Sequence, residues 1–594
     1  MFASRPAPLK NLKNKWMAQW PDALEAWSRF TKLTPPLLLT DTKAEKAEGL
    51  YGSFAMIRLD DHAVVISLRQ VEELELQSFA TEILAHEIGH HVYAPGDLRD
   101  NALLIARIRA GLPMYENQAG FVANLYTDLL INDRLQRSEE LDMAGVYRKL
   151  KKNDAGSLWT LYMKIYENLW GLPPGTLADV AAKEKRLIVD AQLGARVIRA
   201  YSKDWLDGAG RFTALVAPYI MESGFAGRSA IFLPIMDTRD AGAGGGIPDG
   251  LVEIDPEELD GAIHPADDPA ISGFDDTPGD DKAQSPEAGG EVIRGGKKNN
   301  YRSPAQYRDL MKSVASSLKE DELIIRYYRE RALPYLIPFP ARETPRAADP
   351  IPEGLELWDV GQPAQELDWM ESTIRSPVII PGVTTYQRTY GTSEGSLPEK
   401  IPTDLYVGID CSGSMTNPKF SLSYPALAGV IVAMSALRAG AKVMSCLSGE
   451  PGRFTQTDGF IRDEKRTLKL LTGYLGSGYS YGVKRLEETF LGKKEKPPRP
   501  VHLLIVTDQD IFHMLKEVKN GWEIITEALE KTGGGGTFVL NLYTPKSYAK
   551  DLQRMAEIGW DIHMVSSQED MVEFARKFSR RMYDRKAARE RGKG

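Results

Sequence analysis

From about residue 404 onward, apolar strand-like segments alternate with helical ones, and this alternation is the strongest constraint on the fold of the chain. The strand-like segments are 405–410, 442–446, 501–508, 537–543 and 561–566. The helical segments are 421–438, 463–474, 482–490, 514–531, 547–558 and a last one at 568–583. Continuous apolar strands separated by helices predict a parallel sheet that is covered on both faces. We therefore expect a doubly wound, Rossmann-like α/β domain at 403–585.

The remainder of the chain is expected to contain further domains, because 594 residues exceed what one hydrophobic core supports. The expected parts are a mainly helical domain at 1–236, an acidic Gly/Pro-rich disordered linker at 237–300, a helix with an extended segment packing on the C-terminal domain at 301–402, and a basic tail at 586–594. In the first domain, strands at 54–59 and 63–68 form a hairpin, and helices are expected at 71–93, 159–170 and 177–205.

Composition narrows the classes of function and the expected compartment. The net charge of −8 argues against a nucleic-acid-binding protein, whose surface would be basic. No apolar run reaches the roughly 18 residues that a membrane span needs, so no membrane association is expected. The first residues lack the apolar core of a signal peptide, and only two cysteines occur. We expect a cytoplasmic protein.

A D-x-S-x-S pattern follows the first strand of the expected α/β domain. Asp410 ends this strand, and Ser412 and Ser414 lie in the turn after it. Ligands of such sheets bind outside the carboxyl ends of the strands. Two hydroxyls that bind directly, with a carboxylate acting partly through water, suit a hard divalent cation.

This pattern resembles the metal-ion-dependent adhesion site (MIDAS) of von Willebrand factor A (VWA) domains. The resemblance covers about 403–585 and implies two further ligands. In the family a threonine comes from a Gly-rich loop, which here is 476–480; Ser480 would replace the threonine, with Ser477 as the alternative. Asp508, at the end of a later strand, would be the second acidic residue. The implied ion is Mg²⁺, or Mn²⁺ or Ca²⁺, and an acidic residue of a partner protein would complete its shell.

An H-E-x-x-H pattern lies in the expected helix at 71–93. His86 and His90 are four residues apart, so both imidazoles project from one helix face. Two such imidazoles can hold Zn²⁺, and Glu87 can accept a proton from a metal-bound water. A pair of unrelated surface or core histidines is the alternative interpretation.

A catalytic zinc ion needs a third protein ligand. His91 is poorly directed, because neighbouring residues on a helix point about 100° apart. The favoured ligand is Asp128, with Asn124 and Asn132 on the same helix face as groups that orient it. Glu116 and Asp133 are the fallback ligands.

The HEIGHH segment followed by N-x-x-x-D-x-x-I-N resembles the zincin-like metallopeptidase domain that bacterial proteins carry upstream of a VWA-like domain. Such proteins often work with MoxR-type AAA+ ATPases, and the resemblance implies such a partner. The leading hypothesis is a zinc-dependent peptidase recruited to its target through the Mg²⁺ site. The alternatives are a non-catalytic adaptor with a structural zinc site and, as a regulatory addition, a linker carboxylate that occupies the Mg²⁺ site.

Overall fold

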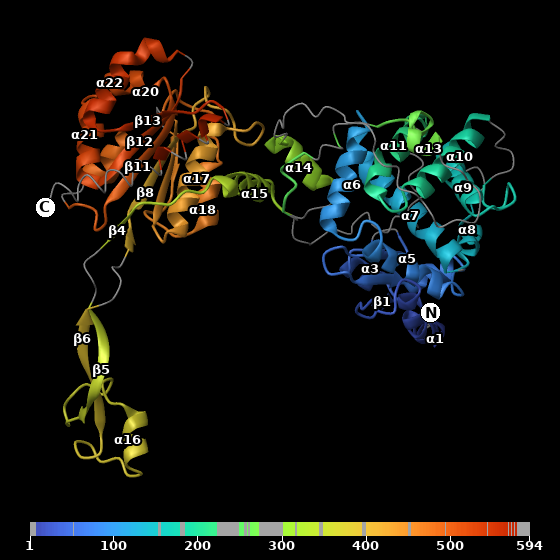
Figure 1. The fold of residues 1–594 in the computed structure, drawn as a ribbon, viewed down its shortest axis with the longest axis horizontal. Helices are drawn as coiled ribbons and strands as arrows, with labels where there is room; N and C mark the ends of the chain where they lie inside the picture. Colours follow the sequence, from blue (N-terminus) through green and yellow to red (C-terminus); the bar gives the residue numbers. More distant parts are fainter. Residues whose placement is uncertain are drawn as a thin grey trace, which may run out of the picture. The chain divides into compact units, whose positions relative to one another are not determined.

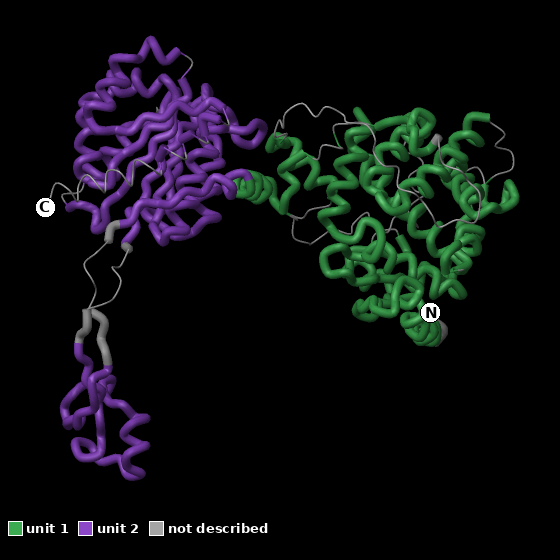
Figure 2. Tube along the Cα trace, in the orientation of Figure 1, with its two compact units in different colours: residues 1–330 green, residues 331–594 purple. Residues whose placement is uncertain are grey.

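The computed structural model describes most of the chain and divides into two compact units, residues 1–330 and 331–594 (Figure 2). The described residues exclude 1–6, 51–52, 140, 152–155, 179–184, 223–248, 255–257, 259–261, 273–300, 315–317, 344–347, 395–399, 450–452, 493–494, 543, 568, 572, 575–576 and 579–594. The expected basic tail and parts of the expected linker and last helix therefore lie outside the described residues.

Unit 1 is mainly helical, which confirms that part of the predicted fold. Its longer helices include α1 (Ala7–Ala18), α5 (Ala80–Val92), α6 (Leu98–Ala110), α7 (Ala119–Ser138), α8 (Met143–Leu150), α9 (Ser157–Leu169), α10 (Lys185–Ala200) and α11 (Trp205–Glu222). Short helices are α2 (Trp20–Glu25), α3 (Thr42–Ala47), α4 (Leu68–Glu73) and α13 (Pro269–Ser272). In the described part of the chain, no helix combines the length and apolar character that a membrane crossing requires.

The predicted hairpin in unit 1 is part of a small three-stranded sheet. Strand β2 (Ala55–Ile57) pairs antiparallel with β3 (Val64–Ser67). Strand β1 (Leu37–Leu39), which the sequence did not predict, pairs parallel with β3, and the strand order is β1-β3-β2. Strand β2 lies against α5, so the sheet backs the helix that carries H-E-x-x-H.

The single helix predicted at 71–93 is wrong, because the structure has two helices there. Ser67 caps α4 by accepting a hydrogen bond from the backbone N–H of Gln70. After α4, Glu75 adopts a φ of 58°, a left-handed conformation that ends a helix. The chain then restarts at α5, whose register places His86, Glu87 and His90 in the interior of the unit.

Helices α5 and α7 approach closely at Gly89. A Cβ atom at this position would lie 2.6 Å from side-chain atoms of both Ile131 and Trp27. A residue with a side chain would therefore push the two helices apart. Gly89 precedes His90, so this close approach sets the separation between the histidine-bearing helix and α7, which carries Asp128.

Part of the predicted linker belongs to the folded unit 1. Leu251 and Ile271 are buried, and Arg302 donates a 2.7 Å hydrogen bond to Glu258 in a buried ion pair. These contacts hold described parts of 249–272 against the helices, so a disordered linker across all of 237–300 is a wrong prediction. Residues 237–248 and 273–300 lie outside the described residues.

The structure also moves the expected boundary at residue 301. Helix α14 (Pro304–Ser313) lies in unit 1, and α15 (Glu320–Ala332) runs across the division at residue 330. The sequence instead placed all of 301–402 with the C-terminal domain. Buried tyrosines on these two helices, Tyr307 and Tyr327, pack with ring centroids 5.7 Å apart, which explains why the helices stay together.

Unit 2 contains a six-stranded mixed sheet with the order β10-β9-β8-β11-β12-β13. The parallel strands are β8 (Asp404–Asp410), β9 (Val443–Gly449), β11 (Val501–Asp508), β12 (Gly533–Asn541) and β13 (Asp561–Met564). Each matches a predicted strand to within a few residues. The antiparallel edge strand β10 (Arg453–Gln456) was not predicted, because all four of its residues are exposed and give no apolar signal.

Helices cover both faces of this sheet (Figure 1). Helices α17 (Tyr424–Arg438) and α18 (Glu464–Leu471) lie on one face, and α20 (Ile511–Glu517), α21 (Gly521–Thr532) and α22 (Ala549–Ile558) lie on the other. Since β9 and β11 flank β8, the direction of winding reverses between β8 and β11. In open α/β sheets, the carboxyl ends of the strands at such a reversal are the usual ligand site.

One predicted helix of unit 2 is wrong in the same way as the helix at 71–93. The segment 514–531 forms two helices, α20 and α21, instead of one. Asn520, which precedes α21, has a φ of 60°, and asparagine tolerates this left-handed conformation better than most residues. The local side-chain chemistry of one asparagine therefore overrides a helical apolar pattern.

The segment 334–399, expected to be extended, contains three strands, which form two antiparallel pairs with the help of a fourth strand that begins at residue 400. Strand β4 (Ala341–Glu343) pairs with β7 (Lys400–Pro402), and β5 (Ala348–Leu357) pairs with β6 (Tyr386–Glu394). A short helix, α16 (Trp369–Arg375), lies between β5 and β6. We refer to residues 352–391 as the hairpin module.

Candidate functional site

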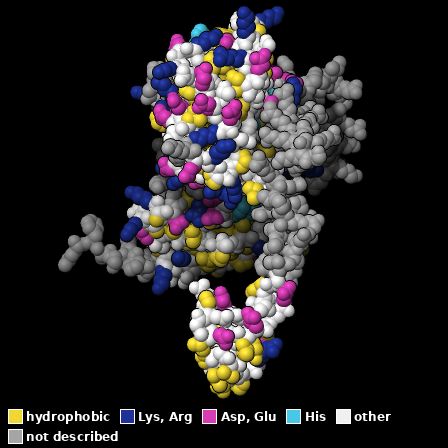
Figure 3. Space-filling view, turned by 90° about the vertical axis from the view of Figure 1, so that its left-hand side faces the viewer, with side chains coloured by type: hydrophobic (Ala, Val, Ile, Leu, Met, Phe, Trp, Pro, Cys, Tyr) yellow, Lys and Arg dark blue, Asp and Glu magenta, His cyan; other side chains and the backbone are white. Residues whose placement is uncertain are grey.

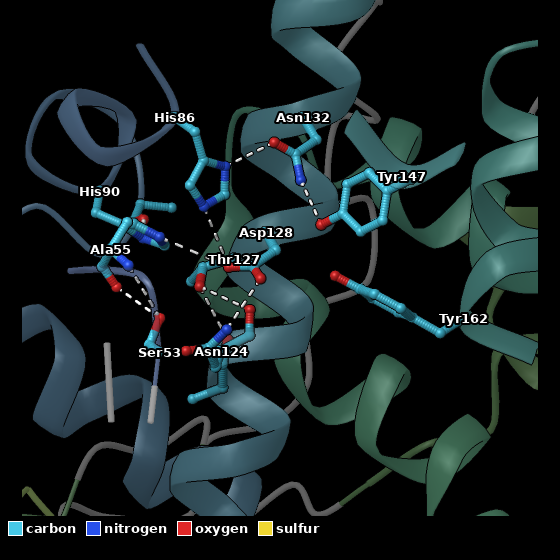
Figure 4. Close-up of polar contacts among 12 residues, drawn as sticks. Ser53, Ala55, His86, His90, Asn124, Thr127, Asp128, Asn132, Tyr147 and Tyr162 are labelled. Carbon is cyan, nitrogen blue, oxygen red and sulfur yellow. Dashed lines mark hydrogen bonds and ion pairs between the residues drawn. The ribbon is translucent and has the colours of Figure 1, made fainter. Parts of the chain in front are cut away.

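The first candidate site lies between α5 and α7 in unit 1. The two imidazoles of α5 are one helical turn apart, as the spacing predicts, and their Nε2 atoms face one carboxylate oxygen of α7 (Figure 4). Asp128 Oδ1 lies 3.6 Å from His90 Nε2 and 3.9 Å from His86 Nε2. One ligand atom from each of the three residues lies within 4.8 Å of the others, so this buried group could hold a metal ion.

The other ring nitrogen of each histidine, Nδ1, lies at hydrogen-bonding distance from a protein oxygen. His90 Nδ1 lies 3.1 Å from the carbonyl oxygen of Ala94, which can only accept a hydrogen bond. His90 Nδ1 therefore carries a proton, and in a neutral imidazole the lone pair is then on Nε2, which faces Asp128. This tautomer is the one that a metal ligand needs.

Asn132, which was predicted to orient Asp128, contacts and orients His86 instead. His86 Nδ1 lies 2.6 Å from Asn132 Oδ1. The Asn132 amide nitrogen donates to the hydroxyl oxygens of Tyr147 at 3.0 Å and Tyr166 at 2.8 Å. In this orientation the amide oxygen accepts from His86 Nδ1–H, and in a neutral imidazole the lone pair is then on Nε2, the nitrogen that faces Asp128.

Asn124 orients the carboxylate of Asp128. Its amide nitrogen donates a 2.9 Å hydrogen bond to Asp128 Oδ2, one turn further along α7 (Figure 4). The other oxygen, Oδ1, is the one that faces both histidines. Asn124, Asp128 and Asn132 are each fully buried, so the polar strip predicted on this helix points into the protein.

The structure places the other candidate ligands elsewhere. Asp133 is held by Arg137, with oxygen–nitrogen distances of 2.7 to 3.0 Å, and Glu116 lies in a short 3-10 helix before α7. His91 faces His62, with ring centroids 3.8 Å apart, and its Nδ1 lies 3.3 Å from the carbonyl oxygen of Gly96. None of these three belongs to the described metal-capable group.

Glu87 lies in the wall of a pocket beside the three ligand candidates. The pocket is polar where His86, Glu87, Asp128 and Asn132 line it. Its other walls are Ser53, Phe54, Ala55, Ile83, Met143, Val146, Tyr147 and Leu150. A carboxylate next to the metal-capable group is the arrangement that general-base chemistry requires.

Tyr147 and Tyr166 support the first site by binding Asn132, and the sequence did not predict this role. They lie on α8 and α9, far from the motif in sequence, and their periodic spacing looks like that of ordinary core residues. Their rings lie 4.6 Å apart, and Tyr166 OH donates a 3.1 Å hydrogen bond to Tyr147 OH. Burial raises the pKa of Tyr166 well above its ordinary value, so it stays a neutral partner for Asn132.

Replacing Asn132 tests this orientation of His86. Asn132→Ala is expected to weaken zinc binding by about 10- to 100-fold, because His86 loses the acceptor that fixes its tautomer. Asn132→Asp is the matched control, since it keeps an acceptor for His86 Nδ1–H. Competition with a chelating dye measures the affinity. Equal affinities for wild type and Asn132→Ala would show that Asn132 does not orient a ligand.

The second candidate site lies at the carboxyl ends of β8 and β11 in unit 2. Asp410 ends β8 and Asp508 ends β11, and these strands are parallel neighbours. Ser412 Oγ lies 3.0 Å from Ser414 Oγ, and Ser414 Oγ donates to Asp508. The structure thus joins Ser412, Ser414 and Asp508 in one hydrogen-bonded group at the point where the winding of the sheet reverses.

Asp410 is held by its own turn and by β11. The backbone N–H of Ser412 donates a 2.8 Å hydrogen bond to Asp410 Oδ1, and Thr507 Oγ1 donates a 2.7 Å hydrogen bond to Asp410 Oδ2. Burial raises the pKa of Asp410 to about 6 and also raises the pKa of Asp508. A bound cation would offset the cost of these two buried charges.

The Gly-rich loop 476–480 is tied to the same turn. The backbone N–H of Gly476 donates a 3.1 Å hydrogen bond to the carbonyl oxygen of Cys411. Ser480 and Ser477 each have a buried Oγ atom that finds no hydrogen-bond partner among the described residues. Either hydroxyl is therefore available to an ion, and the choice between these two residues stays open.

The pKa of Asp410 predicts a pH-dependent effect of Mg²⁺ on stability. Since folding raises this pKa from 3.8 to about 6, the stabilisation from protonated Asp410 is full below pH ~3.8 and lost as pH rises through ~6. Mg²⁺ should therefore raise the melting temperature more at about pH 7.5 than at about pH 5. Calorimetry with and without Mg²⁺ measures both shifts. A larger shift at the lower pH would contradict the assignment.

Comparison of the chain with protein-family models, with curated proteins and with solved structures gives no match. A function for this protein is therefore inferred from the geometry of its two sites.

Proposed function

We propose that unit 1 is a zinc-dependent hydrolase, with peptides as its substrates and a zincin-like site. The observation that carries the proposal is the position of the Nε2 atoms of His86 and His90, 3.9 and 3.6 Å from one oxygen of Asp128. Two imidazoles and one carboxylate are a typical ligand set of catalytic zinc, which keeps a fourth position for water or substrate.

The residues around the site have defined roles in this proposal. Zinc, when bound, supplies the charge that polarises the scissile carbonyl and lowers the pKa of water. Glu87 accepts a proton from the attacking water as the new C–O bond forms, and delivers it to the leaving amine as the C–N bond breaks. Asn132 and Asn124 keep His86 and Asp128 oriented for metal binding throughout.

We further propose that unit 2 is a VWA-type domain with a MIDAS that binds Mg²⁺, or Mn²⁺ or Ca²⁺. The support is the placement of Asp410 and Asp508 on neighbouring parallel strands, with Ser412 and Ser414 in the turn beside them. Mg²⁺ accepts oxygen ligands from outside the protein. The proposed role is to recruit a protein that offers an acidic side chain, and the proposed partner class is a MoxR-type AAA+ ATPase.

A second candidate function is a non-catalytic adaptor in which the metal stabilises unit 1. Burial is the observation that favours it: His90 and Asp128 have exposed fractions of 0% and Glu87 has one of 1%. All three residues of β2, the strand beside α5, are buried as well. A peptide substrate would require these walls to move, whereas a structural metal would not.

Metal removal distinguishes the two candidates. Under the hydrolase proposal, dialysis against a chelator abolishes cleavage of a peptide library, and added Zn²⁺ restores the cleavage. Under the adaptor proposal the holoprotein cleaves nothing, and metal removal only lowers the melting temperature. Metal content measured by mass spectrometry, together with library cleavage followed by mass spectrometry, gives both readouts. Cleavage that persists in the metal-free protein would contradict both candidates.

A further inference from the structure

The hairpin module carries more large apolar side chains on its surface than in its interior. Nine of the 21 exposed large hydrophobic residues in the described chain belong to it: Leu357, Val360, Trp369, Met370, Ile374, Val378, Ile380, Val383 and Tyr390. Leu367 is the buried large apolar residue described in 352–391. Figure 3 shows hydrophobic side chains gathered at the lower end of this module.

Hydrogen bonds rather than an apolar core give the module its shape. Trp358 N–H donates to the carbonyl oxygen of Thr385, and Asp368 N–H donates to that of Tyr386, both at 2.8 Å. A segment of this size buries too little apolar surface to be stable by hydrophobic contacts alone. Soluble proteins seldom leave a contiguous apolar surface of this kind uncovered unless it binds something.

In helix α16, too, a polar residue is buried and apolar residues are exposed. Its buried residue is polar: Ser372 accepts a 2.9 Å hydrogen bond from the backbone N–H of Tyr386. Its exposed residues include Trp369, Met370 and Ile374, with exposed fractions of 61%, 69% and 67%. The helix thus fixes its polar side to the hairpin and leaves its apolar residues outside. Tryptophan and methionine are enriched in protein interfaces.

The charge of the module indicates what kind of partner fits. Residues 352–391 contain six acidic and two basic side chains, a net charge of −4. Both basic residues are paired within the module, Arg388 with Asp368 and Arg375 with Glu371. The remaining acidic side chains are Glu353, Glu356, Asp359 and Glu366, all exposed. No basic side chain of the module is left to neutralise them.

We propose that the hairpin module is a docking surface for a basic protein segment, in which apolar side chains are flanked by lysine or arginine. The apolar side chains of that segment cover the nine exposed residues, and its basic groups meet the four remaining carboxylates. A second copy of the hairpin module or an anionic lipid surface would bring negative charge against negative charge. This interaction is separate from the two metal sites and does not depend on their proposed roles.

The test uses the full-length protein and a fluorescently labelled leucine–lysine amphipathic peptide as the probe. Trp369→Ser combined with Ile374→Ser is expected to weaken peptide binding by about tenfold or more, because two large apolar side chains of the docking surface are lost. The matched control is Phe30→Ser, which removes an apolar side chain with an exposed fraction of 89% in unit 1. A leucine–glutamate peptide of the same length should bind far more weakly than the lysine peptide. Circular dichroism verifies that the variants are folded.

Three outcomes would overturn the proposal. The first is equal affinity of the lysine peptide for wild type and the double variant. The second is self-association of the wild type that the double variant abolishes, seen by sedimentation velocity, which would make a second copy the occupant. The third is co-sedimentation with phosphatidylcholine vesicles that depends on Trp369 and Ile374, which would make a membrane the occupant. Loss of binding in Glu366→Gln and Asp359→Asn variants would support the charge part of the proposal.

Discussion

Glu87→Gln is expected to lower peptide hydrolysis by about 100- to 10,000-fold while zinc stays bound. Glutamine keeps the shape of the side chain but cannot accept the proton of the attacking water. Glu87 lines the pocket beside His86 and Asp128 but is not a member of the metal-capable group, so the metal site itself stays intact. Turnover of a cleaved peptide, measured at equal metal content, gives the ratio.

The control for this result is Glu82→Gln, which changes a carboxylate five residues earlier on α5, outside the pocket. It should leave both turnover and metal content unchanged. If Glu87→Gln retained full turnover with zinc bound, Glu87 would not be the base and the hydrolase proposal would fail. If the variant lost its zinc instead, the residue would act on the metal site and not on the reaction.

Asp410→Asn is expected to weaken Mg²⁺ binding to unit 2 by about 100-fold or more, because it removes a unit charge from a buried site that a divalent cation would share. The amide keeps the size of the side chain, so the turn after β8 has room to stay as it is. Isothermal titration of the full chain with Mg²⁺, after zinc has filled the first site, measures the change.

Asp458→Asn is the matched control for the Mg²⁺ site, since Asp458 is an exposed carboxylate on the same unit. Its effect on Mg²⁺ binding should be negligible. Ser480→Ala and Ser477→Ala separate the two candidate hydroxyls, because the true ligand alone should lower the affinity. Mg²⁺ binding of equal strength in wild type and Asp410→Asn would remove the case for a cation at this position.

The parallel strands of unit 2 were predictable because each is a continuous apolar run that is buried on both faces, as β11 is at all eight of its residues. The edge strand β10 was not predictable, since its exposed residues carry no pattern. The two helix breaks depend on single residues, Glu75 and Asn520, in left-handed conformations. Nothing in the apolar periodicity on either side of such a residue reveals the break.

For the candidate sites, the sequence determined what lies within one element and only the tertiary structure decided what lies between elements. The spacing of His86 and His90 follows from the helical repeat, and the position of Ser412 and Ser414 in the turn after Asp410 follows from the end of a strand. The choice of Asp128 over Glu116 or Asp133 as the residue facing the histidines depends on how α5 crosses α7 at Gly89. The exposure of the apolar residues in the hairpin module was likewise decided only by the tertiary structure. By sequence alone, these residues could equally have formed a core. Local periodicity is encoded by neighbours along the chain, whereas a contact between helices depends on the packing of the whole unit.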